Sequence, residues 1–264
     1  MPDVFHLTDI SIFLAAHKPS GFLTHKSPLD PHETRIVVQA VRDQIGQHVY
    51  PVHRLDKGTC GVLLLALNPD AARSLTQSFA TQQVRKRYLA FVRGWPPETA
   101  FVDHALKPDD APADAAAQSA QTRFTRLACF EIPDSADGRF PTTRVALAAA
   151  EPLTGRRHQI RRHLKHMAHP IIGDATHGKG PLNRWWAARL GLQRLWLHSQ
   201  SLAFPHPETG ETVTVESGLR WVPGVSGDSP GAGELVASPD VAELEPVQQW
   251  LGLWAHLRTF AVQP

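Results

Sequence analysis

Residues 53–68 read HRLDKGTCGVLLLALN, a charged segment followed directly by an apolar one. The apolar run from Val62 to Leu67 is too short and too continuous for a surface helix, so it predicts a buried strand. Asp56 lies just before this strand, where a carboxylate costs free energy unless it is paired or performs a task. The available cationic partners are Arg54 and the arginines of a later segment, 157–162.

The segments on either side mix strands and helices without a regular strand–helix–strand alternation. We expect two short strands around Thr8-Asp9, and further strands over 86–94, 122–130, 144–151 and 192–204. Helices are expected over 34–48, after Asn68-Pro69, at about 157–168 and at about 183–190. This order predicts an α+β fold.

The chain of 264 residues is expected to form one main domain, followed by a short tail. We place this domain at 1–222, a flexible linker at 223–238, and a C-terminal helix that docks back onto the domain at 239–264. Residues 107–121, rich in Ala, Asp and Pro, are expected to be an exposed insertion.

Composition describes an ordinary globular protein, with 42% hydrophobic and 20% charged residues. The longest apolar runs are far too short to span a membrane. Only two cysteines occur, which does not suggest a disulfide framework. The first ten residues lack the pattern of a signal peptide, so we expect a cytoplasmic protein.

Charge is distributed unevenly along the chain. Residues 208–264 carry eight acidic and two basic side chains, which leaves 25 basic against 17 acidic, or a net charge of +8, on residues 1–207. A concentrated positive charge is typical of proteins that bind polyanions, although a solvated surface is the simpler alternative.

The densest basic segment lies between Pro152 and Gly173, with five Lys and Arg side chains, four histidines and no acid. On a helix, Arg157, Arg161 and Lys165 form one stripe and Ile160 faces the core. Since solvated faces normally mix charges, this stripe favours binding to phosphates over a merely solvated face.

Two other kinds of site are weaker hypotheses. His163, His166 and His169 are spaced by threes, which turns them off one helix face, and the neighbouring cations would repel a divalent ion; we expect no metal site. Cys60 lies at the mouth of a buried strand, so a small core thiol is favoured over a nucleophile.

Four ordered segments carry a family resemblance: HKPSG (17–21), HRLDKGTCG (53–61), KRYLAFVRG (86–94) and LTGRRHQIRRHL with HPIIGD (153–174). They resemble the motifs of RluA-type pseudouridine synthases, over roughly residues 10–206. Three more, VRDQIGQHVYPVHRLD, GRFPTTR and GLQRLWLHS, resemble the branch that acts on uridine 65 of tRNA. The resemblance implies the pseudouridine synthase fold: a central mixed, mostly antiparallel sheet flanked by helices and loops.

The resemblance also implies an activity. It predicts that the protein isomerises a uridine in tRNA, at position 65, to pseudouridine with one catalytic aspartate, base flipping and no cofactor. The protein would act as a monomer without an obligatory protein partner or a membrane. The alternatives are the same chemistry on ribosomal RNA and a non-catalytic RNA-binding protein.

Residue roles follow from the motif match. Asp56 is the expected catalytic carboxylate, Arg161 its buried counter-charge and Tyr88 the ring that packs on the base. Arg54 is expected to fill the gap that the flipped base leaves. The expected RNA contacts are Lys18, Arg157, His158, Gln159 and Arg162.

Overall fold

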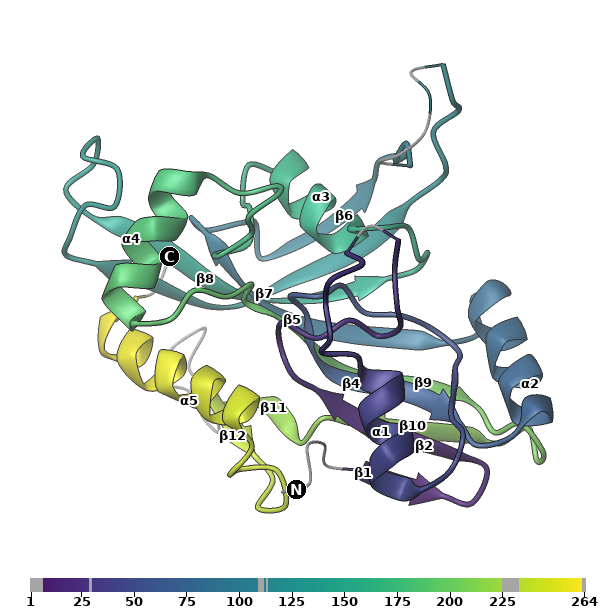
Figure 1. Ribbon diagram of the computed structural model, residues 1–264. Coiled ribbons are helices and arrows are strands. Elements are labelled where there is room, and N and C mark those ends of the chain that lie inside the picture. The colour runs from purple at the N-terminus through teal and green to yellow at the C-terminus, as the bar shows by residue number, and fades with distance from the viewer. Residues whose placement is uncertain (1–6, 29, 109–111, 113, 225–232, 263–264) are drawn as a thin grey trace. The chain divides into compact units, whose positions relative to one another are not determined.

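The computed structural model describes residues 7–28, 30–108, 112, 114–224 and 233–262. The chain forms two compact units, each assembled from separate stretches of sequence. Unit 1 comprises Met1–Lys86, His198–Leu219 and Ser238–Gln248; unit 2 comprises Arg87–Leu197, Arg220–Ala237 and Gln249–Pro264. Figure 1 shows the elements of both units.

Unit 1 is built on a sheet whose strands follow the order β1, β2, β4, β9, with β10 on β9 and the short β3 on β4. Their bounds are β1 Leu7–Ile10, β2 Phe13–Lys18, β3 Tyr50–Pro51, β4 Cys60–Ala66, β9 Leu197–Pro205 and β10 Thr212–Glu216. The pairs are antiparallel except β4 with β9, which run parallel and pair at Cys60 and Gly61.

The predicted strand after Asp56 is β4, and every one of its side chains is buried. Val62 and Leu64 contribute to a core with Ala71 and Leu75 of helix α2 (Pro69–Ala80). Asn68 caps this helix, because its side-chain oxygen accepts a hydrogen bond from the backbone N–H of Ala71 at 2.8 Å. Helix α1 (Val37–Ile45) ends at Gly46, whose φ of 69° is left-handed.

Unit 2 contains an antiparallel sheet in the order β5, β8, β7, with β6 and β13 both paired to β7. The strands are β5 Arg85–Arg93, β6 Thr99–Asp103, β7 Gln121–Ile132, β8 Thr143–Pro152 and β13 Ala261–Val262. Its helices are α3 Gln159–His166, α4 Gly180–Leu190, the later part of α5 Glu245–Leu257 and the 3-10 turn Arg258–Phe260.

Aromatic side chains of α5 pack on the strands of unit 2. The Trp250 ring stacks on Phe91 with centroids 5.2 Å apart, and Trp254 meets Phe130 edge-on at 5.6 Å. Strand β12 (Gly233–Ala237) pairs with β11 (Leu219–Pro223), whereas the linker was expected to cover 223–238. Residues 225–232 of that linker lie outside the described residues.

The predicted α+β class and the mostly antiparallel sheet are confirmed. The first hairpin turn was wrongly placed: Thr8 and Asp9 lie inside β1, and the turn falls at Ser11, whose φ is 30°. In the described part of the chain, none of the helices has the length and apolar character that crossing a membrane requires.

Gly61, where β4 meets β9, provides a test of this packing. Its φ is 102°, and a Cβ atom placed there would overlap the carbonyl oxygen of Ser199. We expect Gly61→Ala to destabilise the fold by about 2–5 kcal/mol, from backbone strain plus overpacking. Gly46→Ala is the matched control: its φ is 69° but a Cβ meets nothing within 4 Å, so strain alone should cost about 1–2 kcal/mol. Equal shifts of the two urea midpoints would contradict the close packing at Gly61.

Candidate active site

Asp56 lies on the turn between β3 and β4 in unit 1. The carbonyl of Asp56 accepts a hydrogen bond from the backbone N–H of Thr59 at 3.0 Å, which closes the turn. Asp56 is half-buried and Arg54, two residues earlier, is exposed. The backbone of Asp56 is therefore fixed by the turn, while the residue remains partly open to the surface.

The HKPSG segment holds this turn through three consecutive carbonyls. The fully buried ammonium of Lys18 donates to the carbonyls of Lys57 at 3.1 Å and Thr59 at 2.7 Å. The hydroxyl of Ser20 donates to Gly58 O at 2.8 Å, and the N–H of Gly21 to Lys57 O at 2.7 Å. These bonds hold the HKPSG segment against the turn that carries Asp56.

The burial of Lys18 differs from the role of RNA contact that the family resemblance implied. Its side chain is fully buried, and it also donates to Pro19 O at 2.9 Å. A buried ammonium on three carbonyl oxygens is an anchor for the turn rather than a group that reaches phosphate.

His53 attaches the start of the same turn to β4. Its Nε2 accepts a hydrogen bond from the N–H of Leu64 at 2.9 Å, and its ring stacks on Phe79 with centroids 4.5 Å apart. Burial, with a contribution from the charge of Lys86, lowers the pKa of His53 to about 3. His53 is therefore neutral and serves as an acceptor.

Cys60 is fully buried, as expected for a core thiol. Its sulfur lies 3.2 Å from Nδ1 of His198, whose Nε2 lies 2.7 Å from the hydroxyl of Ser217. This chain of contacts links β4, β9 and the segment after β10 within unit 1, and it gives Cys60 a structural partner.

In unit 2, Tyr88 lies on β5 opposite Ala150 of β8 and is only 9% exposed. The neighbouring Arg87 forms an ion pair with Glu151 on β8, with Nη1 and Oε1 2.7 Å apart. The strand pairing on this side fixes the backbone from which the tyrosine ring projects.

Arg161 on α3 is buried and bound by Asp174, a partner that the sequence analysis did not anticipate. Nε and Nη2 each donate to one carboxylate oxygen of Asp174, both at 2.8 Å. Burial acts to raise the pKa of Asp174, but the bonds and charge of Arg161 and the N–H of His177 outweigh it, and the pKa lies below its usual value. Asp174 is thus ionised and fixes the plane of the guanidinium.

The other expected RNA contacts on and beside α3 differ in exposure. Arg157 is exposed, and His158 is half-buried with its Nδ1 3.1 Å from Nε2 of His177. Arg162 is half-buried and donates to Lys107 O at 2.6 Å. Gln159 is buried, and its amide binds the side chains of Thr154 and Thr122 and two backbone groups.

The histidines of the basic segment have protein partners. His163 is fully buried between the Thr122 hydroxyl at 2.9 Å and the carbonyl of His104 at 3.0 Å. His169 contacts Arg93 O at 2.8 Å through Nδ1. Within the described ranges, no three His, Cys, Asp or Glu side chains gather as metal ligands would.

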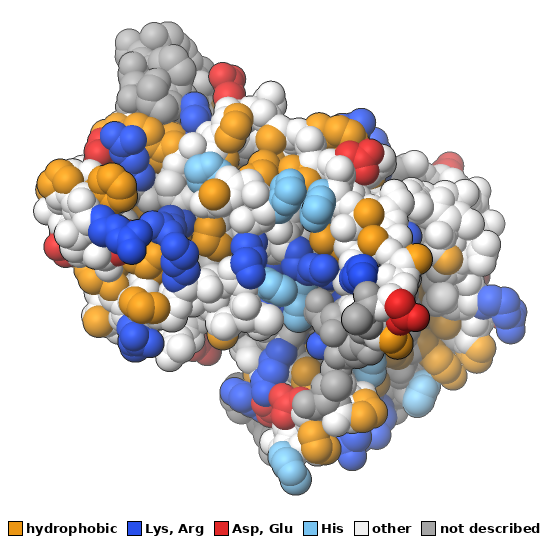
Figure 2. Space-filling model, turned by 90° about the horizontal axis from the view of Figure 1, so that it is seen from above, with side chains coloured by type: hydrophobic (Ala, Val, Ile, Leu, Met, Phe, Trp, Pro, Cys, Tyr) orange, Lys and Arg blue, Asp and Glu red, His pale blue; other side chains and the backbone are white. Residues whose placement is uncertain are grey.

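Figure 2, which views the molecule from the side of α3 in Figure 1, shows Lys and Arg side chains spread over the surface, with histidines among them and few acids. Exposed Arg157 and Lys165 belong to the predicted basic stripe, whereas its third member, Arg161, is buried. The surface charge suits a polyanion, while the buried arginine belongs to an internal ion pair.

Sequence reasoning missed Asp174 and His53. The signal for Asp174 was present, because it is the first acid after a long acid-free basic segment. No comparable signal marks His53, because its role depends on Leu64 and Phe79, which only the fold brings to it.

The lowered pKa of His53 predicts a pH dependence of stability. In the native state His53 stays neutral down to about pH 3, but in the unfolded chain it takes up a proton near pH 6.5. Native stability should therefore decrease as the pH falls from 6.5 toward 3, by up to about 1.4 kcal/mol per pH unit. His53→Gln, which keeps an acceptor but does not titrate, should remove this part of the slope in urea unfolding. Parallel stability curves for the two proteins would contradict the assignment.

The Arg161–Asp174 pair predicts a second pH dependence of stability, at more acidic pH. Asp174→Asn leaves the buried guanidinium without its counter-charge and should cost about 3–5 kcal/mol at pH 7. Because the native pKa lies below 3.8, the wild-type advantage should persist above pH 3.8 and shrink below it. Asp134→Asn, which removes an exposed partner of Arg189 at 3.1 Å, should cost under about 1 kcal/mol. Similar unfolding free energies for both variants at pH 7 would refute the buried pair's role.

Comparison with known proteins agrees with this geometry. The family model described as RNA pseudouridylate synthase matches residues 12–166. The chain is 46% identical over 216 residues to the tRNA pseudouridine synthase C of Vibrio cholerae, covering 79% of this chain and 88% of that protein. It is 47% identical over 215 residues to the protein of the same name from Yersinia pestis, covering 79% and 82%.

Solved structures show the same fold. Human RNA Pseudouridylate Synthase Domain Containing 1 aligns with a TM-score of 0.65 at 22% identity, over 94% of this chain and 95% of that one. Human RNA Pseudouridylate Synthase Domain Containing 4 aligns with a TM-score of 0.58 at 25% identity, over 80% and 86%. With the Asp56 turn and the motifs on either side of it, these matches show that the chain belongs to the RNA pseudouridylate synthase family.

Proposed function

We propose that this protein isomerises uridine to pseudouridine in tRNA, at position 65. The observation that carries the proposal is the half-buried Asp56 on a turn fixed by Lys18, Ser20 and Gly21. The tRNA substrate is supported by the names of relatives that are 46–47% identical over 79% of the chain. Position 65 is supported by the resemblance of residues 41–56, 138–144 and 191–199 to that branch.

The reaction rearranges bonds within one nucleotide. The C1′–N1 glycosidic bond breaks, the base turns, and a C1′–C5 bond forms; C5 loses a proton and N1 gains one. The atoms of substrate and product are the same, so the proposal needs no redox partner or activated donor. Asp56 supplies the carboxylate, either by attack on the sugar or base or by taking a proton from the sugar.

Arg161 and Tyr88 complete the proposed catalytic set. Arg161 supplies a buried positive charge to the proposed reaction, held in place by its two bonds to Asp174. Tyr88 packs its ring against the extruded base. Because β8 and Asp174 fix these two groups before RNA binds, little ordering is left for the reaction step.

Three arginines and one histidine provide the RNA contacts in this proposal. Arg54 fills the gap left by the flipped uridine, which offsets part of the few kcal/mol of lost stacking. Arg157, with Arg162 and His158, contacts the phosphate backbone, whereas Lys18 and Gln159 support the fold from inside. The protein acts on tRNA in the cytoplasm as a monomer, without a cofactor or a metal.

Asp56→Asn tests the catalytic assignment. Pseudouridine formation in a tRNA transcript should fall by at least about a hundredfold, because the amide is a poor base and a poor nucleophile. Affinity for the transcript should change little, since removing an anion does not weaken contacts to phosphate. Asp70→Asn, an exposed acid on α2 with a side chain 89% exposed, is the control and should retain full activity. Full turnover by Asp56→Asn would contradict the assignment.

The substrate is tested separately with transcripts. Wild-type protein should form pseudouridine in a tRNA that carries uridine at position 65 and none when cytidine replaces it. Formation in ribosomal RNA fragments but not in tRNA would replace the tRNA proposal while leaving the chemistry intact. Binding of both RNAs without any isomerisation would favour a non-catalytic RNA-binding protein.

A further inference from the structure

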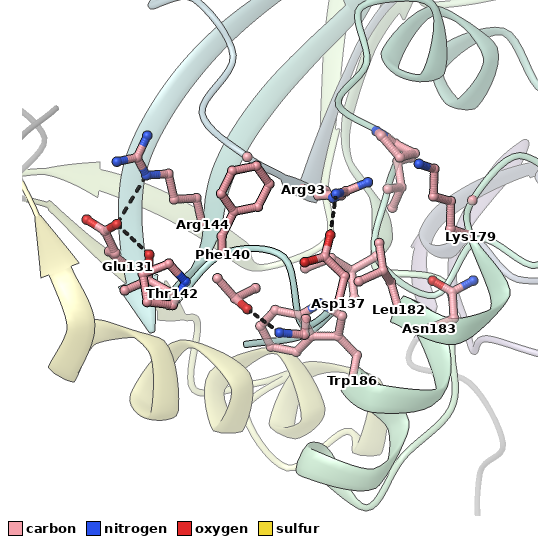
Figure 3. A pocket seen from close by; sticks show the side chains of 18 residues that line it. Arg93, Glu131, Asp137, Phe140, Thr142, Arg144, Lys179, Leu182, Asn183 and Trp186 are labelled. Atoms are coloured by element: carbon pink, nitrogen blue, oxygen red, sulfur yellow. Dashed lines mark hydrogen bonds and ion pairs between the residues drawn. The ribbon is translucent and has the colours of Figure 1, made fainter. Parts of the chain in front are cut away.

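Unit 2 contains a pocket of about 590 Å³ between the loop that joins β7 to β8, the Pro170–Ile172 turn and the start of α4. Figure 3 shows the side chains that line it. None of the residues to which the isomerisation is assigned is among them. Its volume lies within the range of about 300–1,000 Å³ that is typical of sites for small organic groups.

The deep wall of the pocket is apolar. Ile171, Leu182 and Trp186 line it, and each is at least nine-tenths buried. Contact with such a wall stabilises a flat apolar group, whereas a charged group would lose its hydration there without gaining a polar partner. The occupant should therefore present an aromatic or apolar face to the pocket.

At the mouth lies Phe140, which is 63% exposed although its ring is large and apolar. The loop that presents it is held by specific hydrogen bonds. Thr143 Oγ1 accepts from the N–H of Ala136 at 2.9 Å and donates to the carbonyl of Asp134 at 2.7 Å, and Ser135 Oγ accepts from the N–H of Gly138. An exposed aromatic ring on a fixed loop is a stacking surface, since its position is set before a ligand arrives.

The rim of the pocket carries more positive than negative charge. The rim contains three basic residues, Arg93, Arg144 and Lys179, and two acidic residues, Asp137 and Glu131. Arg93 binds Asp137 and Arg144 binds Glu131, both at 3.2 Å, so the acids are neutralised by arginines on the same rim. Exposed Lys179, just before α4, adds the net positive charge that a phosphate group requires.

We propose that this pocket binds a second nucleobase of the RNA substrate, one that is not isomerised. Its ring stacks on Phe140 against the apolar wall, and its phosphate lies near Lys179. Five residues of the GRFPTTR segment, Phe140–Arg144, line the pocket, and the isomerisation itself gives this segment no role. The inference rests on the proposed function, because it takes RNA as the substrate.

The same pocket wall also contacts the turn that orients Arg161. Asn183, which lines the pocket, donates to Asp174 O at 2.8 Å and accepts from the N–H of Gly173 at 3.1 Å. A base held in the pocket thus lies against the segment that fixes a catalytic side chain. Occupation of the pocket should therefore help to register the RNA for reaction.

Phe140→Ala tests the stacking surface. Affinity for the tRNA transcript should fall by about tenfold, as expected for the loss of one stacked base. KM should rise by that factor while kcat at saturating tRNA stays within about twofold, since the reacting groups are untouched. Phe101→Ala is the matched control: Phe101 is 55% exposed in the same unit, its ring lies under the Arg123 guanidinium, and it does not line the pocket. Its affinity should be unchanged.

A second variant and a cross-link keep the test decisive. Ala136→Trp fills the pocket from the same loop and should reproduce the KM effect if Phe140→Ala unfolds. A photoreactive phenylalanine at position 140 should cross-link to one nucleotide other than the isomerised uridine, whereas the same group at 101 should not. Equal affinities for both alanine variants, or equal cross-linking from both positions, would overturn the pocket proposal.

Wild-type protein measured in the same assays separates this inference from the proposed function. If wild-type protein forms pseudouridine but the two alanine variants behave alike, the pocket proposal fails and the proposed function stands. If wild-type protein forms none in any RNA tested, the proposed function fails first. Cross-linking of position 140 to the isomerised uridine itself would also overturn the proposal, by making the pocket part of the reaction site.

Discussion

The turn that carries Asp56 depends on one buried ammonium. Lys18 sits at the end of β2, and its three donors meet backbone carbonyls that would otherwise lose their hydrogen bonds to water inside the protein. Because β2 pairs with β4 and the turn leads directly into β4, the lysine, the turn and the sheet constrain one another. Neither the strand nor the backbone of the turn can move without breaking these bonds.

In unit 2 a buried charge again fixes a segment of the proposed site, but here the charge that does so is negative. There a buried carboxylate, Asp174, holds a buried guanidinium, Arg161, through two parallel hydrogen bonds. Two backbone N–H groups, those of Thr176 and His177, also bind Asp174, so the carboxylate is fixed in its turn. Each unit thus places one charged group of the proposed reaction on a support fixed by internal polar bonds, which is how enzymes reduce reorganisation during catalysis.

Much of this fold was predictable from local pattern. The apolar run after Asp56 predicted the buried strand β4, and the pair Asn68-Pro69 predicted that α2 begins at Pro69. Long-range polar contacts could not be predicted, because Lys18 reaches carbonyls some 40 residues away and its sequence neighbours give no sign of it. The sequence analysis therefore expected Lys18 to be an RNA contact and did not anticipate that its side chain is buried.

The candidate site, too, was only partly predictable from the sequence. The family motifs were enough to select Asp56 and Arg161, but the partner of Arg161 required the turn Gly173-Asp174 to be placed beside α3. The pocket beside α4 could not be predicted either, because its walls come from four stretches of sequence between Arg93 and Trp186 that only the fold brings together.

Pseudouridine mapping in cellular RNA tests the central claim most directly. Total tRNA and ribosomal RNA would be compared between cells with this gene, cells without it, and deleted cells that express either the wild-type chain or Asp56→Asn. The account predicts that one tRNA pseudouridine, at position 65, disappears on deletion and returns with the wild-type chain but not with Asp56→Asn. An unchanged pseudouridine map after deletion, or full restoration by Asp56→Asn, would contradict it.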